Sequence, residues 1–378
     1  MTKRPRPPAL LALALLGAGL AGCATTGAGR DRMQETERAI RDRGLDPERV
    51  VVPYQLSEEM RDWVHSEVSN IGSPEKRLRS LLVALFAREE GRLTYERGRT
   101  ATAREVWSGG VANCLSFTHL FVGLAREIGL DVYYLRVADL QHFEKDGDLV
   151  VASEHVTAAY GPPTGRLILD FSEEAGFDYH QTQPLNDLGA IALFYSNLGA
   201  TAIREGNNAK ALDLLEESIR LDPELADGWV NYGVALRRDG RLEQAEAAFR
   251  RALEANPRLV PAYTNLAGLL ERSGRVDEAR RLLELTDRGS NRNPFSYLAL
   301  GDLSMREARL EEAGRYFRRA QRLEPGNAEV LAALGQWALA AGRTDEARRW
   351  LRKARRIDPE APRVGELGRS LDPTASDG

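Results

Sequence analysis

The sequence predicts an α+β domain followed by an all-α superhelix of repeated helix pairs. A 34-residue pattern of small and large apolar residues fills the C-terminal half, and helix-spaced apolar residues followed by strand-like segments precede it. The composition is globular, with 43% apolar and 29% charged residues, and 378 residues exceed one ordinary domain. We therefore expect an N-terminal domain over residues 34–175, a connection over 176–191 and the superhelix over 192–361.

The first 22 residues are expected to be a leader that takes no part in the fold. Basic residues precede an apolar run, Ala9–Leu20, which is too short to cross a bilayer as a helix. The run ends in Leu-Ala-Gly-Cys, which resembles the lipobox of bacterial lipoproteins, and the alternative is ordinary cleavage beside an unrelated cysteine. The resemblance implies that Cys23 carries lipid such as palmitate. Because Ala24 rather than aspartate follows, it also implies the outer membrane, facing the periplasm, with residues 23–33 as lipidated tether.

Net charge and cysteine content limit the partners of the chain. The formal charge is -4, and removal of the three positive charges of the leader takes it to -7. An acidic mature chain argues against nucleic acid as a partner. The chain has two cysteines. If Cys23 carries lipid, Cys114 is left unpaired in an oxidising compartment, and such a thiol calls for a functional explanation.

The repeat pattern keeps its register over five windows. The eighth and twentieth positions are small, which lets two helices approach closely, and the fourth and twenty-fourth are large and apolar. This pattern resembles tetratricopeptide repeats, and the resemblance implies a groove that binds a protein or peptide partner. The third window has Asn291 where the others have a helix-stopping proline, so we expect an irregular boundary there. The windows are 192–225, 226–259, 260–293, 294–327 and 328–361, with a partial cap and tail over 362–378.

Capping residues and apolar spacing predict the elements of the N-terminal domain. Ser73 and Pro74 start one helix, and Thr102 with Glu105 forms a capping box for another. Helices followed by an antiparallel sheet indicate the α+β class. The expected helices are 74–91, 102–107 and 114–128, and the expected strands are Val132–Val137, Leu149–Tyr160 and Arg166–Phe171.

Cys114 is the candidate nucleophile of this domain. It follows Asn113, a good N-cap, and therefore lies in the first turn of its helix, where the helix dipole favours a thiolate. It also lies three residues before Phe117 on the apolar stripe. We therefore expect the thiol to point toward the sheet.

His155 is the histidine that can meet an acid on a neighbouring strand. The segment Gly161–Thr164 is turn-like, and a four-residue loop there would pair Tyr160 with Gly165. In that register His155 lies opposite Asp170, within about 5 Å on the same face. A one-residue slip would weaken this pairing without abolishing it.

A cysteine at a helix start, a histidine on one strand and an aspartate on the next provide a thiolate nucleophile, its base and an orienting acid. The segments GGVANCLSFTHLFVGLAREIGL, SEHVTAAY and RLILDFS resemble the transglutaminase-like family, a relative of papain-type folds. The resemblance implies Cys114 as nucleophile, His155 as general base and acid, and Asp170 as orienter. Many members have an aromatic residue two positions after the histidine. Here that position is Thr157, which leaves the substrate contacts open.

The remaining polar residues predict an oxyanion hole but no metal site. The hole would use the backbone N–H of Cys114 and one more donor, for which Trp107 and Tyr95 are candidates. His119 is five residues past Cys114 and is therefore turned away from its face of the helix. The sequence has no HExxH or CxxC pair, so we expect neither metal nor cofactor.

These predictions leave two functions open. The first is acyl transfer at an amide bond through a Cys114 thioester, which water or an amine then resolves. The second is a non-catalytic scaffold lipoprotein that assembles an envelope complex through its repeats, with Cys114 as a small core residue.

Overall fold

The computed structural model describes the chain from residue 28 to residue 372 apart from six short gaps, with the side chains of 28–30 and 138–154 also left out. The predicted leader, the lipidation site Cys23 and the repeat boundary at Asn291 lie outside the described residues. Within these residues, no helix combines the length and the apolar character that crossing a bilayer requires. The gaps are 69–71, 89–91, 97, 147–148, 172–181 and 288–292.

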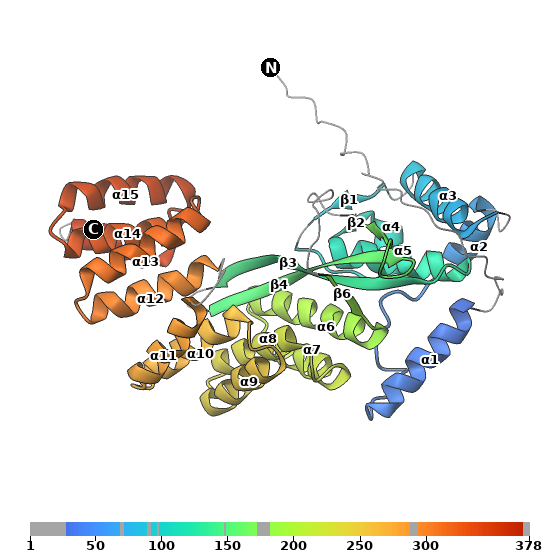
Figure 1. Ribbon diagram of the computed structural model, residues 1–378, viewed down its shortest axis with the longest axis horizontal. Helices are drawn as coiled ribbons and strands as arrows, with labels where there is room; N and C mark the ends of the chain where they lie inside the picture. The colour runs from blue at the N-terminus through green and yellow to red at the C-terminus, as the bar shows by residue number, and fades with distance from the viewer. Residues whose placement is uncertain are drawn as a thin grey trace, which may run out of the picture. The chain divides into compact units, whose positions relative to one another are not determined.

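The chain divides into two compact units, and the first comprises residues 1–142 and 153–228. Its helices begin where side chains cap them. The Ser73 hydroxyl accepts a hydrogen bond from the Lys76 N–H, and Thr102 and Glu105 form the predicted capping box. The helices before the sheet are α1 Ala28–Asp42, α2 Glu58–Glu67, α3 Pro74–Ala87, α4 Ala103–Gly109 and α5 Cys114–Glu127 (Figure 1).

A four-stranded sheet with the order β5-β4-β3-β6 follows these helices. The three predicted strands are present, and β6 is an additional strand within the predicted connection. It pairs antiparallel with β3, with Tyr134 opposite Leu185. Pro184 is compatible with β6 because that strand lies at the edge of the sheet. The strands are β3 Val132–Asp146, β4 Leu149–Tyr160, β5 Leu167–Leu169 and β6 Thr182–Leu185.

The predicted register between β4 and β5 is wrong by two residues. Tyr160 pairs with Leu167 rather than with Gly165. The loop is longer than predicted because Gly161 and Gly165 both lie within it, with φ of +92° and +93°. These are left-handed conformations that glycine adopts without strain.

The first predicted repeat lies in the same unit as the sheet. Helix α6, Asp187–Arg204, begins before the first repeat window, and its buried residues 190–195 belong to the hydrophobic cluster that also contains Phe121 of α5. Helix α7, Asn208–Leu221, packs on α6. The first helix of the repeats therefore helps to form the core of the α+β domain.

The second unit comprises residues 143–152 and 229–378, and helix pairs make up its repeats. The small eighth position of a repeat is explained at Gly301, where an added Cβ would lie 2.3 Å from the ring of Phe317. A side chain there would displace a buried ring, so the two helices need glycine to approach. The helices are α8 Ala226–Arg238, α9 Leu242–Ala255, α10 Val260–Arg272, α11 Val276–Asp287, α12 Pro294–Arg306, α13 Leu310–Leu323, α14 Ala328–Ala340 and α15 Thr344–Ile357.

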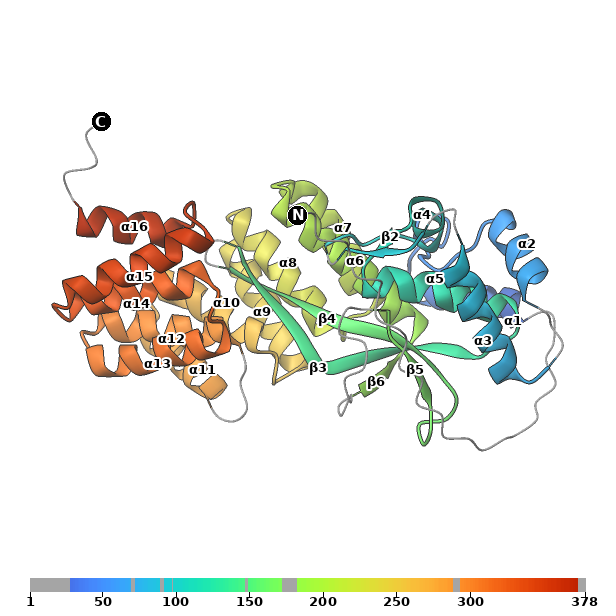
Figure 2. The ribbon, with the colours of Figure 1, turned by 90° about the horizontal axis from the view of Figure 1, so that it is seen from above.

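A last helix, α16 Pro362–Leu371, covers the end of the array. It contacts α14 and α15, and Figure 2 shows it beside them. Arg363 donates two hydrogen bonds of 2.7 Å to the carboxylate of Asp302. Burial alone would lower the pKa of Arg363, but the charges of Asp302 and Glu329 outweigh it and raise that pKa. The capping helix is therefore held by a charged pair as well as by apolar packing.

Candidate active site

The start of α5 is fixed by a set of polar contacts around Cys114. The side chain of Asn113 accepts a hydrogen bond from the Ser116 N–H at 2.9 Å and donates one to the Thr100 hydroxyl at 2.9 Å. The Ser116 hydroxyl in turn accepts the N–H of Ala101 at 2.8 Å. Cys114 is the first residue of the helix and is partly exposed. The thiol therefore has a fixed backbone and access to solvent.

His155 and Asp170 lie together on the sheet. His155 Nε2 is 3.0 Å from Asp170 Oδ2, and their side chains are 2% and 6% exposed. In the observed register the two residues are diagonal rather than direct neighbours. They still share a face because the register differs from the predicted one by an even number of residues. The hydroxyl of Thr157 donates to the carbonyl of Leu169 and ties β4 to β5 beside the pair.

Cys114 lies close enough to His155 to influence the pKa of its ring. Because Nε2 of the ring faces Asp170, Nδ1 is the nitrogen left for the sulfur. Burial alone would lower the pKa of His155, but the hydrogen bonds and charges of Asp170 and Cys114 raise it to about 10. The imidazole is therefore protonated at neutral pH and places a positive charge beside Cys114.

Thr118 is a residue of this site that the sequence reasoning missed. Its hydroxyl donates to the carbonyl of Cys114 at 2.8 Å and lies 3.4 Å from the carbonyl of Val156 on β4. It thereby bridges the first turn of α5 to the residue after His155. A polar residue four positions after the cysteine, on an otherwise apolar helix face, was the signal available in the sequence.

Phe171 anchors the strand end that carries Asp170. Its ring stacks on Phe117 at a centroid distance of 5.6 Å and lies 5.3 Å from the ring of Phe121. Both partners belong to α5, the helix that begins with Cys114. The aromatic contacts therefore hold Asp170 in place against the cysteine helix.

Trp107 is not available as the predicted oxyanion donor in this structure. Its indole Nε1 donates a hydrogen bond of 2.9 Å to Glu59 on α2. An indole has one donor, so none remains for a substrate. The fused ring packs instead in the helical layer of the domain, where Trp63 meets it edge-on at 4.9 Å.

Tyr95 remains a predicted donor. It lies on a short strand that pairs in parallel with a second one, and its direct partner is Ala112, two residues before Cys114. The pairing brings the backbone of Tyr95 alongside the segment that leads into α5. The strands are β1 Thr94–Tyr95 and β2 Val111–Ala112.

His119 is a core residue. Its Nδ1 lies 2.9 Å from the hydroxyl of Tyr134, and its ring packs edge-on against Phe194 of α6. Burial lowers the pKa of His119 to about 3, so the ring stays neutral. In the described part of the chain, no group of three or more His, Cys, Asp or Glu side chains could hold a metal ion.

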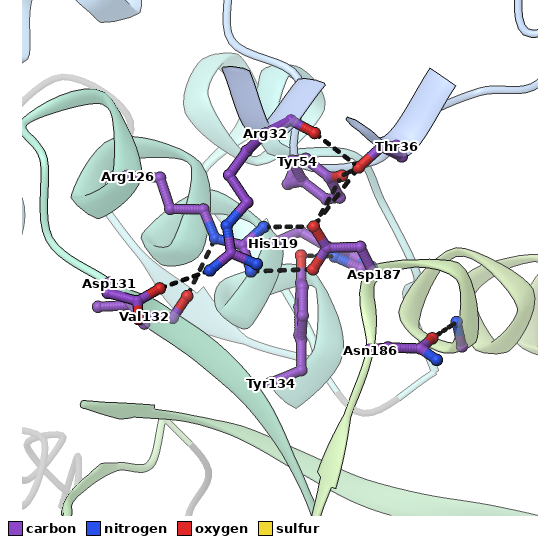
Figure 3. A network of polar contacts seen from close by, with 11 residues as sticks. Arg32, Thr36, Tyr54, His119, Arg126, Asp131, Val132, Tyr134, Asn186 and Asp187 are labelled. Carbon is purple, nitrogen blue, oxygen red and sulfur yellow. Dashed lines mark hydrogen bonds and ion pairs between the residues drawn. The ribbon is translucent and has the colours of Figure 1, made fainter. Parts of the chain in front are cut away.

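The far end of α5 is held by a buried ion pair (Figure 3). Arg126 donates to both carboxylate oxygens of Asp187, each at 2.9 Å, and Asp187 is the first residue of α6. Tyr54 donates a further hydrogen bond of 3.3 Å to Asp187. Burial raises the pKa of Tyr54, as does the charge of Asp187, so the phenol stays protonated. The cysteine helix and the first repeat helix are thus joined by a charged contact.

The repeats match known protein families. Residues 236–294 and 304–371 match one model of the tetratricopeptide repeat, and residues 197–260 match another. These matches confirm the predicted repeats. No curated protein matches the chain.

Three solved structures are similar to part of this chain, and two of them are described as tetratricopeptide-repeat proteins. YrrB, described as a tetratricopeptide-repeat protein with an unusual peptide-binding site, is 19% identical over 47% of this chain and 92% of its own, with a TM-score of 0.35. PilF of Pseudomonas aeruginosa is 22% identical over 47% and 81%, with a TM-score of 0.42. TTC0263 of Thermus thermophilus is 21% identical over 48% and 98%, with a TM-score of 0.43. Similarities at this level carry no argument about function.

Proposed function

We propose that this chain, whose residues 197–294 and 304–371 match tetratricopeptide repeats, is a thiol-dependent acyl-transfer enzyme that binds a protein partner through its array. Repeats of this family generally bind proteins or peptides. The observation that supports the catalytic part is that His155 lies 3.0 Å from Asp170 and has its pKa raised by both Asp170 and Cys114. These are the three groups that thiolate catalysis requires.

The proposed reaction has two steps. In the first, the thiolate of Cys114 attacks an amide carbonyl carbon. A C–S bond forms, and the C–N bond breaks as the imidazolium of His155 gives its proton to the departing nitrogen. In the second, His155 takes a proton from water or from an amine that attacks the thioester. The C–S bond then breaks, and a carboxylic acid or a new amide is released.

The negative charge that develops on the carbonyl oxygen needs donors beside the sulfur. The backbone N–H of Cys114 lies at the start of α5, where the N–H groups of the first turn have no partner within the helix. Tyr95 is the proposed second donor. The carboxylate of Asp170 keeps the imidazole oriented through both steps.

An acyl-enzyme test addresses this chemistry directly. Incubation with p-nitrophenyl acetate should place an acetyl group on Cys114, detected by intact mass after acid quenching and removed by hydroxylamine, as expected for a thioester. His155→Ala should slow acylation by roughly 10² to 10⁴. His65→Ala is the control, because the His65 side chain is 42% exposed and pairs with Glu127 instead. Acylation of Cys114 at equal rates in both variants would rule out the proposed base.

A binding scaffold is the second candidate function, and the repeat matches favour it independently of the thiol. In that case the α+β domain is a folded module whose core includes the first repeat helix, α6. Unreactive Cys114 in a folded chain that still captures a protein partner would favour the scaffold over the enzyme.

We also propose that the mature chain is a lipoprotein of the cell envelope, anchored in the outer membrane and facing the periplasm. The proposal rests on the lipobox-like segment that ends at Cys23. Cys23→Ser should abolish metabolic labelling with a palmitate analogue and release the chain from membranes, whereas Cys114→Ser should leave both unchanged. Membrane attachment that persisted in Cys23→Ser would contradict the anchor.

A further inference from the structure

The second helices of the last two repeats carry cations at four matched positions. Positions 22, 25, 26 and 29 of the 34-residue windows are all basic in the fourth and fifth repeats, whereas the first repeat has three acids among the same four positions. Residues at equivalent positions of successive repeats lie on the same side of an array. We call this set the cationic face: Arg315, Arg318, Arg319 and Arg322 on α13, and Arg349, Arg352, Lys353 and Arg356 on α15.

The cationic face points to solvent. Its spacing of i, i+3, i+4 and i+7 places four side chains on one side of each helix. All eight members are exposed except Arg319, which is half-buried. On α15 the buried residues are Ala347, Leu351 and Ala354, which lie on the opposite side of the helix. The cations therefore cover the surface that packing leaves uncovered.

Within the described residues, four members of this face lack the acidic partners that arginines have elsewhere in the array. Arg250 forms ion pairs of 2.8 Å with Glu246 and 2.6 Å with Glu278, and Arg309 pairs with Glu312 at 2.9 Å. Among the described residues, no corresponding ion pair involves the first and last members of the cationic face on each helix. These are Arg315, Arg322, Arg349 and Arg356.

We propose that the cationic face binds the phosphate headgroups of an anionic phospholipid bilayer. A guanidinium group pairs with phosphate through two parallel hydrogen bonds. Each cation near an anionic bilayer strengthens the binding of a protein to that bilayer roughly fivefold. A group of eight is large enough for membrane attachment through charge alone.

Charge complementarity favours a bilayer over a protein or a nucleic acid. The core of a protein interface is depleted in charge and rich in aromatic residues. Of the large apolar side chains exposed in the described chain, Ile357 is the one on these two helices. These two helices carry no exposed aromatic side chain on which bases could stack, which disfavours a single-stranded nucleic acid. The proposal does not depend on the reactivity of Cys114.

Vesicle flotation tests the proposal with a chain that begins at Ala24, which lacks the predicted lipid site and keeps every described residue. It should bind vesicles that contain phosphatidylglycerol, bind vesicles of phosphatidylcholine alone far more weakly, and be released by high salt. The variant with Arg315→Gln, Arg322→Gln, Arg349→Gln and Arg356→Gln should bind roughly six hundredfold more weakly, fivefold for each cation removed. Glutamine is a good helix former, so these exposed positions should keep their fold.

The matched control removes the same charge from other exposed positions of the array. It carries Arg238→Gln, Arg258→Gln, Arg272→Gln and Arg281→Gln, and it should keep most of its binding. An equal loss in both variants would overturn the proposal, because net charge would then explain the binding. Equal binding to neutral vesicles would also overturn it. Retention of the chain on polyglutamate without any binding to vesicles would overturn the proposal as well, since an acidic protein would then be the occupant of this face.

Discussion

We expect Arg126→Met to lower the free energy of unfolding of the N-terminal unit by about 3 kcal/mol or more. The side chains of Arg126 and Asp187 are 5% and 15% exposed, so removal of the cation leaves a largely buried carboxylate without a counter-charge. Because the pair joins α5 to α6, the first repeat helix should lose protection together with the cysteine helix. Urea unfolding with hydrogen exchange read separately in α5 and α6 measures both effects.

A second variant and an exposed pair serve as controls for this prediction. Arg126→Met combined with Asp187→Asn should be destabilised by less than the sum of the two single changes, because no unpaired charge remains. Arg32→Met breaks an ion pair with Asp131 whose side chains are 40% and 80% exposed, so it should change stability by at most about 1 kcal/mol. Equal effects of Arg32→Met and Arg126→Met, or unchanged exchange in α6, would contradict a structural role for the buried pair.

The second large effect concerns the reactivity of Cys114. His155→Ala should slow alkylation by iodoacetamide near pH 6.5 by roughly tenfold to a hundredfold, because an ordinary thiol is about 1% ionised there. The raised pKa of His155 keeps a positive charge beside Cys114 in the intact site. Rates measured across the pH range, with labelling assigned to Cys114 by mass spectrometry, give the comparison.

The sign of the pH dependence follows from the raised pKa of His155. This pKa rises from 6.5 to about 10, so the stability that the protonated ring contributes is fully present below pH 6.5 and is lost as the pH rises through about 10. Alkylation of the intact site should therefore stay level through neutral pH. In His155→Ala the rate of alkylation should rise with pH as for an ordinary thiol, with a midpoint at about pH 8.5.

Asp170→Asn tests whether Asp170 acts on the reactivity of Cys114 through His155 or merely lies near that histidine. It keeps the shape of the side chain but removes one of the charges that raise the pKa of His155. Alkylation should therefore fall to a rate between those of the intact chain and His155→Ala. Superimposable pH profiles for all three proteins would exclude the ion-paired thiolate.

Local signals in the sequence were sufficient to predict the repeats and the first residues of several helices. A small residue packed against a large apolar one, as at Gly301 and Phe317, is a steric requirement that recurs every 34 residues, so periodicity alone reveals it. The capping box of Thr102 and Glu105 lies within four residues and is equally local. The same holds for Asn113, which caps α5 and places Cys114 in its first turn.

The details of the site depended on contacts distant in sequence. The register of β4 and β5 followed from the left-handed glycines Gly161 and Gly165, which lengthened the loop by two residues. The prediction that His155 and Asp170 share a face nevertheless holds, because the side-chain period of a strand is two. The donor of Trp107 is engaged by Glu59, 48 residues away in the chain, and no local pattern records that contact.

The sequence by itself determined the repeat array and the α+β class of the N-terminal domain, because capping and helix-pair packing act over a few residues or repeat at a fixed interval. It also determined which elements carry Cys114, His155 and Asp170. Only the tertiary structure decided how these side chains meet, that Thr118 bridges α5 to β4, and that α6 completes the core of the N-terminal domain. The ion pair between Arg126 and Asp187 spans 61 residues, and its strength arises from burial, which exists only once the chain has folded.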